Sequence, residues 1–341
     1  MFLSLIRKTK PDLYRQSLEL FPRQISDTLK NGVWTNAAKL RSVKAIVING
    51  MGGSHLAPAI IASLLKKELK LPVLIDPGYD IAGYVTKDTA YIVSSYSGTT
   101  EEPLAAYKKA KARGALVIAV TAEGGNTLSQ LARKDGAPLF EFPTSANPSR
   151  QPRLGLGASM ASFILVFKKL GALKNSVSKD LAKAAKKRAD ASRALAVRFK
   201  NREIVLMSGP LFEGNLETLR NQINESAKNV ATHLILPDLN HHSLESLSAP
   251  KSNRKRLAVL CIDSALDDPK VQKRAEISKE IFRKQGIPVI AHRLSAKTVL
   301  EQGLELLQFG SWLSYHLAIQ NRVDPSAIPW VDRFKKQLAA T

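Results

Sequence analysis

The chain has 341 residues, of which 44% are apolar, and this composition excludes an intrinsically disordered protein and allows two globular cores. No apolar run approaches the roughly 18 residues that span a bilayer, and the nearest candidate, 56–65, contains Pro58. The N-terminus is too short and too quickly basic for a secretory signal. The only cysteine, Cys261, lies in an apolar run, so disulfides are excluded and a packed thiol is expected. We therefore predict a cytoplasmic protein.

The net charge of +22 exceeds what a phosphate site needs, and much of it falls in residues 174–202. A basic segment can bind nucleic acid or an acidic surface. No aromatic or glycine pattern of a nucleic-acid module accompanies this one. We interpret it as a solvated helix and expect neither a nucleic-acid nor a membrane partner.

Short apolar, β-branched runs alternate with longer helical patterns in the first half, which indicates a parallel α/β layer structure. After an N-terminal helical segment over 1–40, the expected strands are 45–49, 73–76, 90–94, 116–121 and 139–142. The expected helices are 55–69, 100–113, 127–134 and 156–170. Most of these strands lack alternation, so helices should cover both faces of the sheet.

Residues 176–200 are rich in Ala, Lys and Arg without Gly or Pro, which predicts one long connecting helix. A second α/β pattern follows, with strands over 204–208, 234–236, 257–263 and 288–293 and helices over 216–230, 271–285, 299–319 and 331–338. The fold class is therefore two doubly wound parallel-sheet α/β/α sandwich domains joined by a long helix. Their expected bounds are 41–172 for the first domain, 173–202 for the basic helix, 203–320 for the second domain and 321–341 for the tail helix.

Two loops in the first half are typical of ligand binding. The glycine loop, Gly50-Met51-Gly52-Gly53-Ser54, follows a strand; its glycines allow close backbone approach, and Ser54 can cap the next helix. The alternative is a tight βα turn without a ligand. A dinucleotide fingerprint is disfavoured because His55 stands where the third glycine would be needed.

The hydroxyl loop, residues 95–100, places four serine and threonine hydroxyls where a strand ends and a helix begins. Helix amides and hydroxyls together form an uncharged cradle for phosphate. A capping box of Thr99 and Glu102 is the structural alternative, but such a box needs only one hydroxyl. We therefore favour phosphate binding.

Further along, Glu225 lies in the polar run 221–228, and His241 follows in Leu239-Asn240-His241-His242. Sugar isomerisation needs a base that moves a proton between neighbouring carbons and a second group that opens the ring. The alternative is a carboxylate on a helix surface and a histidine in a turn. Arg153 follows a Pro- and Ser-rich loop, and a loop arginine is ordinarily solvated.

Taken in order, these motifs closely resemble the bifunctional phosphoglucose/phosphomannose isomerases, which contain two flavodoxin-like sugar-isomerase (SIS) domains. The resemblance implies that Glu225 carries the proton between C1 and C2 and that Arg153 stabilises the enediolate. It also implies that His241, often supplied by the neighbouring subunit of a dimer, assists ring opening together with Lys335. The implied substrate-binding residues are Gly52, Gly53 and Ser54 on the sugar side and Ser95, Ser97 and Thr100 around the phosphate.

The implied activity interconverts fructose 6-phosphate with glucose 6-phosphate and mannose 6-phosphate in a homodimer, without a metal or an organic cofactor. The chain departs from the family pattern after the glycine loop, at residues 55–58, and beside His241, where His242-Ser243 replaces an asparagine and an acidic residue. It also has Ser326-Ala327 in the tail motif. The alternatives are another SIS phosphosugar isomerase and a non-catalytic phosphosugar-binding regulator.

Overall fold

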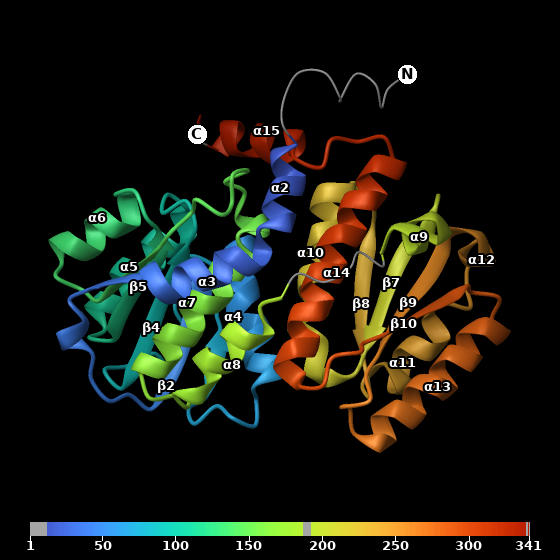
Figure 1. Ribbon diagram of the computed structural model, residues 1–341, viewed down its shortest axis with the longest axis horizontal. Coiled ribbons are helices and arrows are strands. Elements are labelled where there is room, and N and C mark those ends of the chain that lie inside the picture. The colour runs from blue at the N-terminus through green and yellow to red at the C-terminus, as the bar shows by residue number, and fades with distance from the viewer. Residues whose placement is uncertain (1–11, 187–191, 339, 341) are drawn as a thin grey trace. The chain divides into compact units, whose positions relative to one another are not determined.

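The computed structural model describes residues 12–186, 192–338 and 340 (Figure 1). The chain divides into two compact units, each built around its own sheet. The first unit lies within residues 16–187 and 297–304, and the second lies within 1–15, 188–296 and 305–341. In the part of the chain that the structure describes, no helix is both long and apolar enough to cross a bilayer.

The sheet of the first unit has the strand order β1-β6-β5-β4-β2-β3, in which only β1 runs antiparallel to its neighbour. Its strands are β1 (Val33–Thr35), β2 (Ala45–Gly50), β3 (Val73–Ile75), β4 (Thr89–Ser95), β5 (Leu116–Ala122) and β6 (Leu139–Phe142). The five parallel strands confirm the predicted ones within one or two residues. The three-residue edge strand β1 was missed, because so short a run shows no period of its own.

Helices cover both faces of this sheet, as the lack of alternation predicted, and every residue of β4 and β5 is buried. The helices are α3 (Phe21–Asn31), α4 (Gly53–Leu64), α5 (Glu101–Ala112), α6 (Thr127–Lys134), α7 (Leu156–Lys169) and α8 (Ser176–Ala184). The α5 and α6 side chains enclose one core with β2, β4 and β5. On the other face α7 packs against α3, α4 and α8, which stand together in front of the sheet in Figure 1.

The predicted single connecting helix over 176–200 is wrong. Helix α8 ends at Ala184, and Ala185 has a ψ of 66°, which is not helical. Val177 and Leu181 are buried, so this half of the segment packs as part of the first unit and does not form a solvated rod. A separate helix, α9 (Ser192–Ala196), follows in the second unit, and residues 187–191 lie outside the described part. Helix propensity is a weak signal that tertiary packing can override, and here α8 and α9 belong to different units.

The sheet of the second unit is wholly parallel, with the order β10-β9-β7-β8. Its strands are β7 (Glu203–Ser208), β8 (Ala231–Ile235), β9 (Leu257–Asp263) and β10 (Val289–Arg293). The helices are α10 (Glu213–Ala227), α11 (Leu239–Ser246), α12 (Asn253–Arg256), α13 (Pro269–Lys284), α14 (Val299–Gln320) and α15 (Pro329–Leu338). Helix α11 was not predicted as a helix.

Helices α11 and α13 pack together on one face of the second sheet, and α10 covers the other face beside the later turns of α14. Cys261 belongs to the core beneath α11 and α13 and is fully buried, which confirms the prediction of a packed thiol. Burial raises the pKa of this thiol far above its ordinary value. The side chain is therefore a small apolar packing group and not a nucleophile.

Candidate active site

The carboxyl ends of β2 and β4 lie side by side, because the two strands pair in parallel with Gly50 opposite Ser94. From β2 the chain passes to β3 on one side of β2, and β4 lies on the other side. This change of direction is a topological switch point, where open parallel sheets bind ligands in the crevice beyond the carboxyl ends of their strands. The glycine loop and the hydroxyl loop therefore start from neighbouring positions.

The glycine loop has little room for side chains. Gly52 is the N-cap of α4 and has a φ of 52° and a ψ of −126°, a conformation that favours glycine. A Cβ on Gly53 would lie 2.9 Å from the carbonyl carbon of Pro152 and 3.0 Å from the amide nitrogen of Arg153. The two glycines thus let the backbone turn sharply and let a third segment approach it.

Ser54 does not cap α4, so that expectation is wrong: it lies inside the first turn, after the N-cap Gly52. Its Oγ accepts a hydrogen bond of 3.0 Å from the amide of Tyr96, and its carbonyl accepts one of 2.9 Å from Ser94 Oγ. These bonds join the glycine loop to the start of the hydroxyl loop. Ser54 therefore fixes the spacing of the two loops, and its hydroxyl proton is still able to donate to a ligand.

In the hydroxyl loop, the buried Ser95 Oγ accepts from the Gly98 amide at 3.0 Å and donates to Thr100 Oγ1 at 3.1 Å. Ser97 is exposed, and Thr100 is half-buried. Gly98 has a φ of 68°, and a Cβ there would lie 1.8 Å from Asn126 Oδ1. Ser95 therefore braces a tight turn, while the hydroxyls of Ser97 and Thr100 lie on its more accessible side.

The capping-box alternative for this loop is not realised. The N-cap of α5 is Thr100 and not Thr99, and its side chain makes no capping hydrogen bond. Thr99 instead directs its hydroxyl to Ser97 Oγ at 3.2 Å. The N-cap side chain therefore leaves the N-terminus of α5 uncapped, and the hydroxyl loop leads directly into this end of the helix, where an anion is favoured.

Arg153 lies in a short 3₁₀ helix, Pro152–Leu154, whose backbone packs against the glycine loop. It is buried, with 4% of its surface exposed, and is thus not the solvated residue that a loop arginine ordinarily is. Asn147 Nδ2 donates to Tyr96 Oη at 2.9 Å and to the Gln151 carbonyl at 3.0 Å, so it links this segment to the hydroxyl loop. Sequence reasoning missed Tyr96 and Asn147, because neither residue type carries a signal for bracing a loop.

Glu225 lies half-buried near the end of α10, and its neighbours in the 221–228 motif fasten that end. Gln222 Nε2 donates to Ser311 Oγ at 2.9 Å, and Asn224 Oδ1 accepts from the amide of Ala231, the first residue of β8, at 2.7 Å. Three further bonds serve the same purpose: Tyr14 Oη to Ser226 Oγ at 2.8 Å, Lys228 Nζ to the Asp324 carbonyl at 2.6 Å, and Asn321 Nδ2 to the Ala227 carbonyl at 3.0 Å. Most polar side chains of the motif thus position the helix that carries the carboxylate.

His241 and His242 lie in the first turn of α11 and not in an irregular turn. Both are exposed. His242 Nε2 lies 3.1 Å from Asp238 Oδ2, and its Nδ1 lies 2.9 Å from Ser243 Oγ, so both ring nitrogens have partners within the helix. Within the described part of the chain, the His241 ring forms no hydrogen bond. Of the two rings, His241 is the one free to contact a substrate.

Within the second unit, Glu225 and His241 are held near opposite ends of the edge strand β8. Asn224 is bonded to the first residue of β8, whereas α11 begins after the last, and a strand of this length is roughly 13–16 Å long. The C-terminal tail starts near Glu225, because Asn321 Nδ2 donates to the Ala227 carbonyl at the end of α10. Lys335 follows on α15, where it is exposed. The proposed base and the ring-opening histidine are thus separated within the unit.

Comparisons with known proteins agree with this architecture. Residues 39–136 match the SIS domain family, and residues 188–338 match the family described as the bacterial phospho-glucose isomerase C-terminal SIS domain. The bifunctional phosphoglucose/phosphomannose isomerase of Caldicellulosiruptor bescii is 27% identical over 95% of this chain and 98% of its own length. The enzyme of that name from Aquifex aeolicus is 28% identical over 89% of this chain and 94% of its own length.

Solved structures share the fold at low sequence identity. The C-terminal domain of glucosamine-fructose-6-phosphate aminotransferase from Francisella tularensis has a TM-score of 0.68 at 15% identity, covering 93% of this chain and 99% of its own. Tagatose-6-phosphate ketose/aldose isomerase from Escherichia coli has a TM-score of 0.65 at 15% identity, covering 94% and 96%. The two matched domains and the near full-length relatives together show that this chain has two SIS domains and is similar over almost its whole length to the bifunctional phosphoglucose/phosphomannose isomerases.

Proposed function

We propose that this protein is an aldose–ketose isomerase that interconverts fructose 6-phosphate with glucose 6-phosphate and mannose 6-phosphate. The main support is the meeting of the glycine loop, the hydroxyl loop and the Arg153 segment at the switch point of the first sheet. Open parallel sheets bind their ligands at this position. The full-length relatives, which bear the names of both isomerase activities, support the choice of hexose phosphates.

The phosphate binds at the uncapped N-terminus of α5, where Ser97 and Thr100 donate their hydroxyl protons and Ser95 holds the turn. Gly52, Gly53 and Ser54 lie on the sugar side, where a side chain at Gly53 would collide with the Arg153 segment. The guanidinium of Arg153 is a delocalised cation and stabilises the developing enediolate.

Glu225 removes a proton from one of the two neighbouring carbons and returns it to the other, so that a cis-enediol forms between the two steps. Reprotonation of C2 from either face yields the glucose or the mannose epimer, and one site therefore serves both sugars. His241 opens the ring and Lys335 acts at the ring oxygen. The chemistry requires no metal and no organic cofactor.

The working form is a homodimer in the cytoplasm, in which His241 of one subunit serves the site that contains Glu225 of the other. The support is that these two residues are attached to opposite ends of β8. A ring-opening acid and a proton-transfer base must both contact one hexose, and a hexose is much shorter than the roughly 13–16 Å strand between them. Nucleic acid is not a partner in this proposal.

The test is to incubate the purified protein with fructose 6-phosphate and to separate the sugar phosphates that form. Glucose 6-phosphate and mannose 6-phosphate should both appear, and Glu225→Gln should reduce the rate by roughly 10²–10⁴-fold. Near wild-type turnover in Glu225→Gln would refute the assignment of the base. If the sugar phosphate binds without any isomerisation, the protein is a regulator and the proposed activity is wrong.

A further inference from the structure

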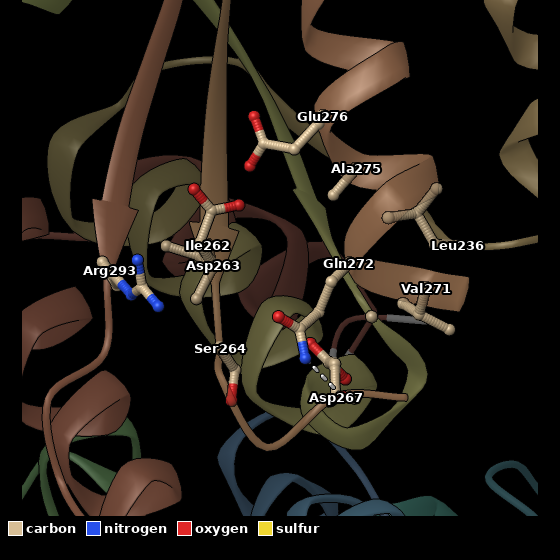
Figure 2. Close-up of a pocket in the computed structure, with 11 residues that line it drawn as sticks. Leu236, Ile262, Asp263, Ser264, Asp267, Val271, Gln272, Ala275, Glu276 and Arg293 are labelled. Atoms are coloured by element: carbon tan, nitrogen blue, oxygen red, sulfur yellow. Dashed lines mark hydrogen bonds between the residues drawn. The ribbon is translucent and has the colours of Figure 1, made fainter. Parts of the chain in front are cut away.

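The second sheet has its own switch point, between β7 and β9, at the position that corresponds to the phosphate cradle of the first sheet. A cavity of about 70 Å³ lies there, beyond the carboxyl ends of all four strands (Figure 2). The loop that follows β9 contains carboxylates where the corresponding loop of the first sheet contains hydroxyls. The two switch points therefore differ in chemistry.

A phosphate would be repelled at this second position. Asp263, Asp267 and Glu276 line the cavity, and of the lining residues only Arg293 is basic. The N-terminus of α13 is already capped, because Asp268 accepts a hydrogen bond of 2.8 Å from the Lys270 amide. The free backbone amides that attract an anion to a helix N-terminus are therefore already partly bonded to the Asp268 side chain.

Two of the three lining carboxylates already have a cationic partner. Lys279, which is 4% exposed, places Nζ 2.8 Å from Asp263 Oδ2 and 2.7 Å from Glu276 Oε1. The ammonium group of Lys279 thus neutralises two of the carboxylates that line the cavity. A buried carboxylate without such a partner is costly, because it loses its hydration without gaining a compensating charge.

Asp267 is the carboxylate that lacks a partner. It is 7% exposed, and its Oδ1 is fully buried without a hydrogen-bond partner among the residues that the structure describes. This oxygen lies 2.3 Å from where a Cβ on Gly209 would be, so it occupies the space that the absent side chain leaves beside the cavity. Gln272 Nε2 donates to the Asp267 carbonyl at 2.8 Å and holds the residue in place. This bond fixes the backbone of Asp267, and burial against Gly209 restricts its side chain.

We propose that this cavity binds a small molecule through a primary ammonium group, which donates to the accessible side of the Asp267 carboxylate as Lys279 donates to Asp263 and Glu276. An ammonium compensates the negative charge of a buried carboxylate and an uncharged hydroxyl does not, which favours an amine over a polyol. The cavity volume admits only a few non-hydrogen atoms. The ligand has the opposite charge to the sugar phosphate of the proposed isomerase site.

The test uses the intact protein and calorimetric titration with ethanolamine at pH 7.5, with glycerol and inorganic phosphate as an uncharged and an anionic probe. Ethanolamine should bind saturably with a dissociation constant in the millimolar range, as expected for so small a ligand. Asp267→Asn, which keeps the size of the side chain, should weaken binding by at least about tenfold. Asp268→Asn is the matched control: it removes the neighbouring charge, retains a good helix cap and should leave binding unchanged.

The pH dependence provides a second readout. Burial, and then the charge of Asp263, raise the pKa of Asp267 to about 6. The other charged groups around the cavity are Glu276 and Lys279 on α13 and Arg293 on β10, whereas the residues after β7 and β8 are the uncharged Gly209 and Leu236. Because the ammonium must displace a proton below this pKa, its apparent affinity should fall about tenfold between about pH 7.5 and about pH 5.

Three results would overturn the proposal: no saturable binding of ethanolamine, equal affinity in Asp267→Asn, or binding of glycerol or phosphate as tight as that of ethanolamine. Gly209→Ala gives an independent check, since a methyl group there would collide with Asp267 Oδ1 and fill the space beside it. Circular dichroism establishes that each variant is folded. A folded Gly209→Ala variant that binds ethanolamine as the wild type does would also refute the site.

Discussion

Mixing two inactive variants tests whether the isomerase site is shared between subunits. Glu225→Gln removes the proton acceptor and keeps the shape of the side chain, and His241→Asn removes the ring-opening group. Each homodimer should retain about 1% of wild-type activity or less, since either acid–base group contributes roughly 10²–10⁴-fold. Activity toward fructose 6-phosphate is measured after subunit exchange under mild denaturant followed by dilution.

The expected recovery follows from the geometry. Glu225 and His241 lie near opposite ends of β8, and in the proposed dimer each site therefore takes one residue from each subunit. Equal mixing gives half heterodimers, and each heterodimer contains one site with both native residues and one with neither. Activity should therefore rise to about a quarter of the wild-type value. If each chain supplied both residues to its own site, no mixture would contain an intact site.

A reciprocal mixture serves as the control. The double variant Glu225→Gln/His241→Asn, mixed equally with the wild type, leaves only the wild-type homodimers active when sites are shared. The activity of this mixture should thus fall by about half after exchange. Sites within single chains predict no fall. No recovery in the first mixture together with no fall in the second would refute the shared site, provided that mass spectrometry shows that heterodimers formed.

Four further outcomes are expected. Replacing Ser97 and Thr100 with alanine should raise KM for fructose 6-phosphate by roughly tenfold or more per hydroxyl, with kcat changed less, because each charge-assisted bond contributes about 1.5–3 kcal/mol; an unchanged KM would place the phosphate elsewhere. Gly98→Ala should lower the free energy of unfolding by about 1–3 kcal/mol in urea titrations, from left-handed strain and collision with the neighbouring side chain. His242→Asn should leave turnover within a few-fold of wild type, because both ring nitrogens are bonded within α11; a strong defect would show that it is the ring-opening group. The pKa of Asp267 is about 6 in the folded protein and roughly 3.9 in the unfolded chain. The free energy of unfolding of the wild type therefore falls as the pH rises between these values. Asp267→Asn should be more stable than the wild type by about 1–3 kcal/mol at pH 7.5, and this difference should shrink toward pH 4.

Local pattern predicted most of the elements correctly. The strands β2, β4, β5 and β9 and the helices α5, α6 and α7 agree with the sequence to within one or two residues. Their signals are long apolar runs or helical periods, which depend on neighbouring residues only. The errors fall where that period is absent or overruled, as in the three-residue β1, in α11 and in the connecting segment that divides into α8 and α9.

The residue types of the candidate site could also be predicted from the sequence. The hydroxyl loop, the glycine loop and Glu225 carry the residue types that phosphate binding and proton transfer need, and these types do not depend on the fold. The roles of the residues that support these loops could not be predicted from the sequence. Ser54 was predicted to cap a helix and instead joins two loops, and Asn147 gave no signal although it bonds to Tyr96 and to the Gln151 carbonyl.

The sequence by itself determined the two α/β halves, the motifs and their order, because residue type and short-range spacing suffice for these. Only the tertiary structure decided which motifs meet. Strand order, a matter of pairing between distant segments, places the loops after β2 and β4 side by side. A hydrogen bond between α10 and the start of β8 holds Glu225 at the opposite end of that strand from His241. The tertiary structure also buries Asp267 without a partner, since the burial of a carboxylate depends on every element packed around it and on no residue pattern in the chain.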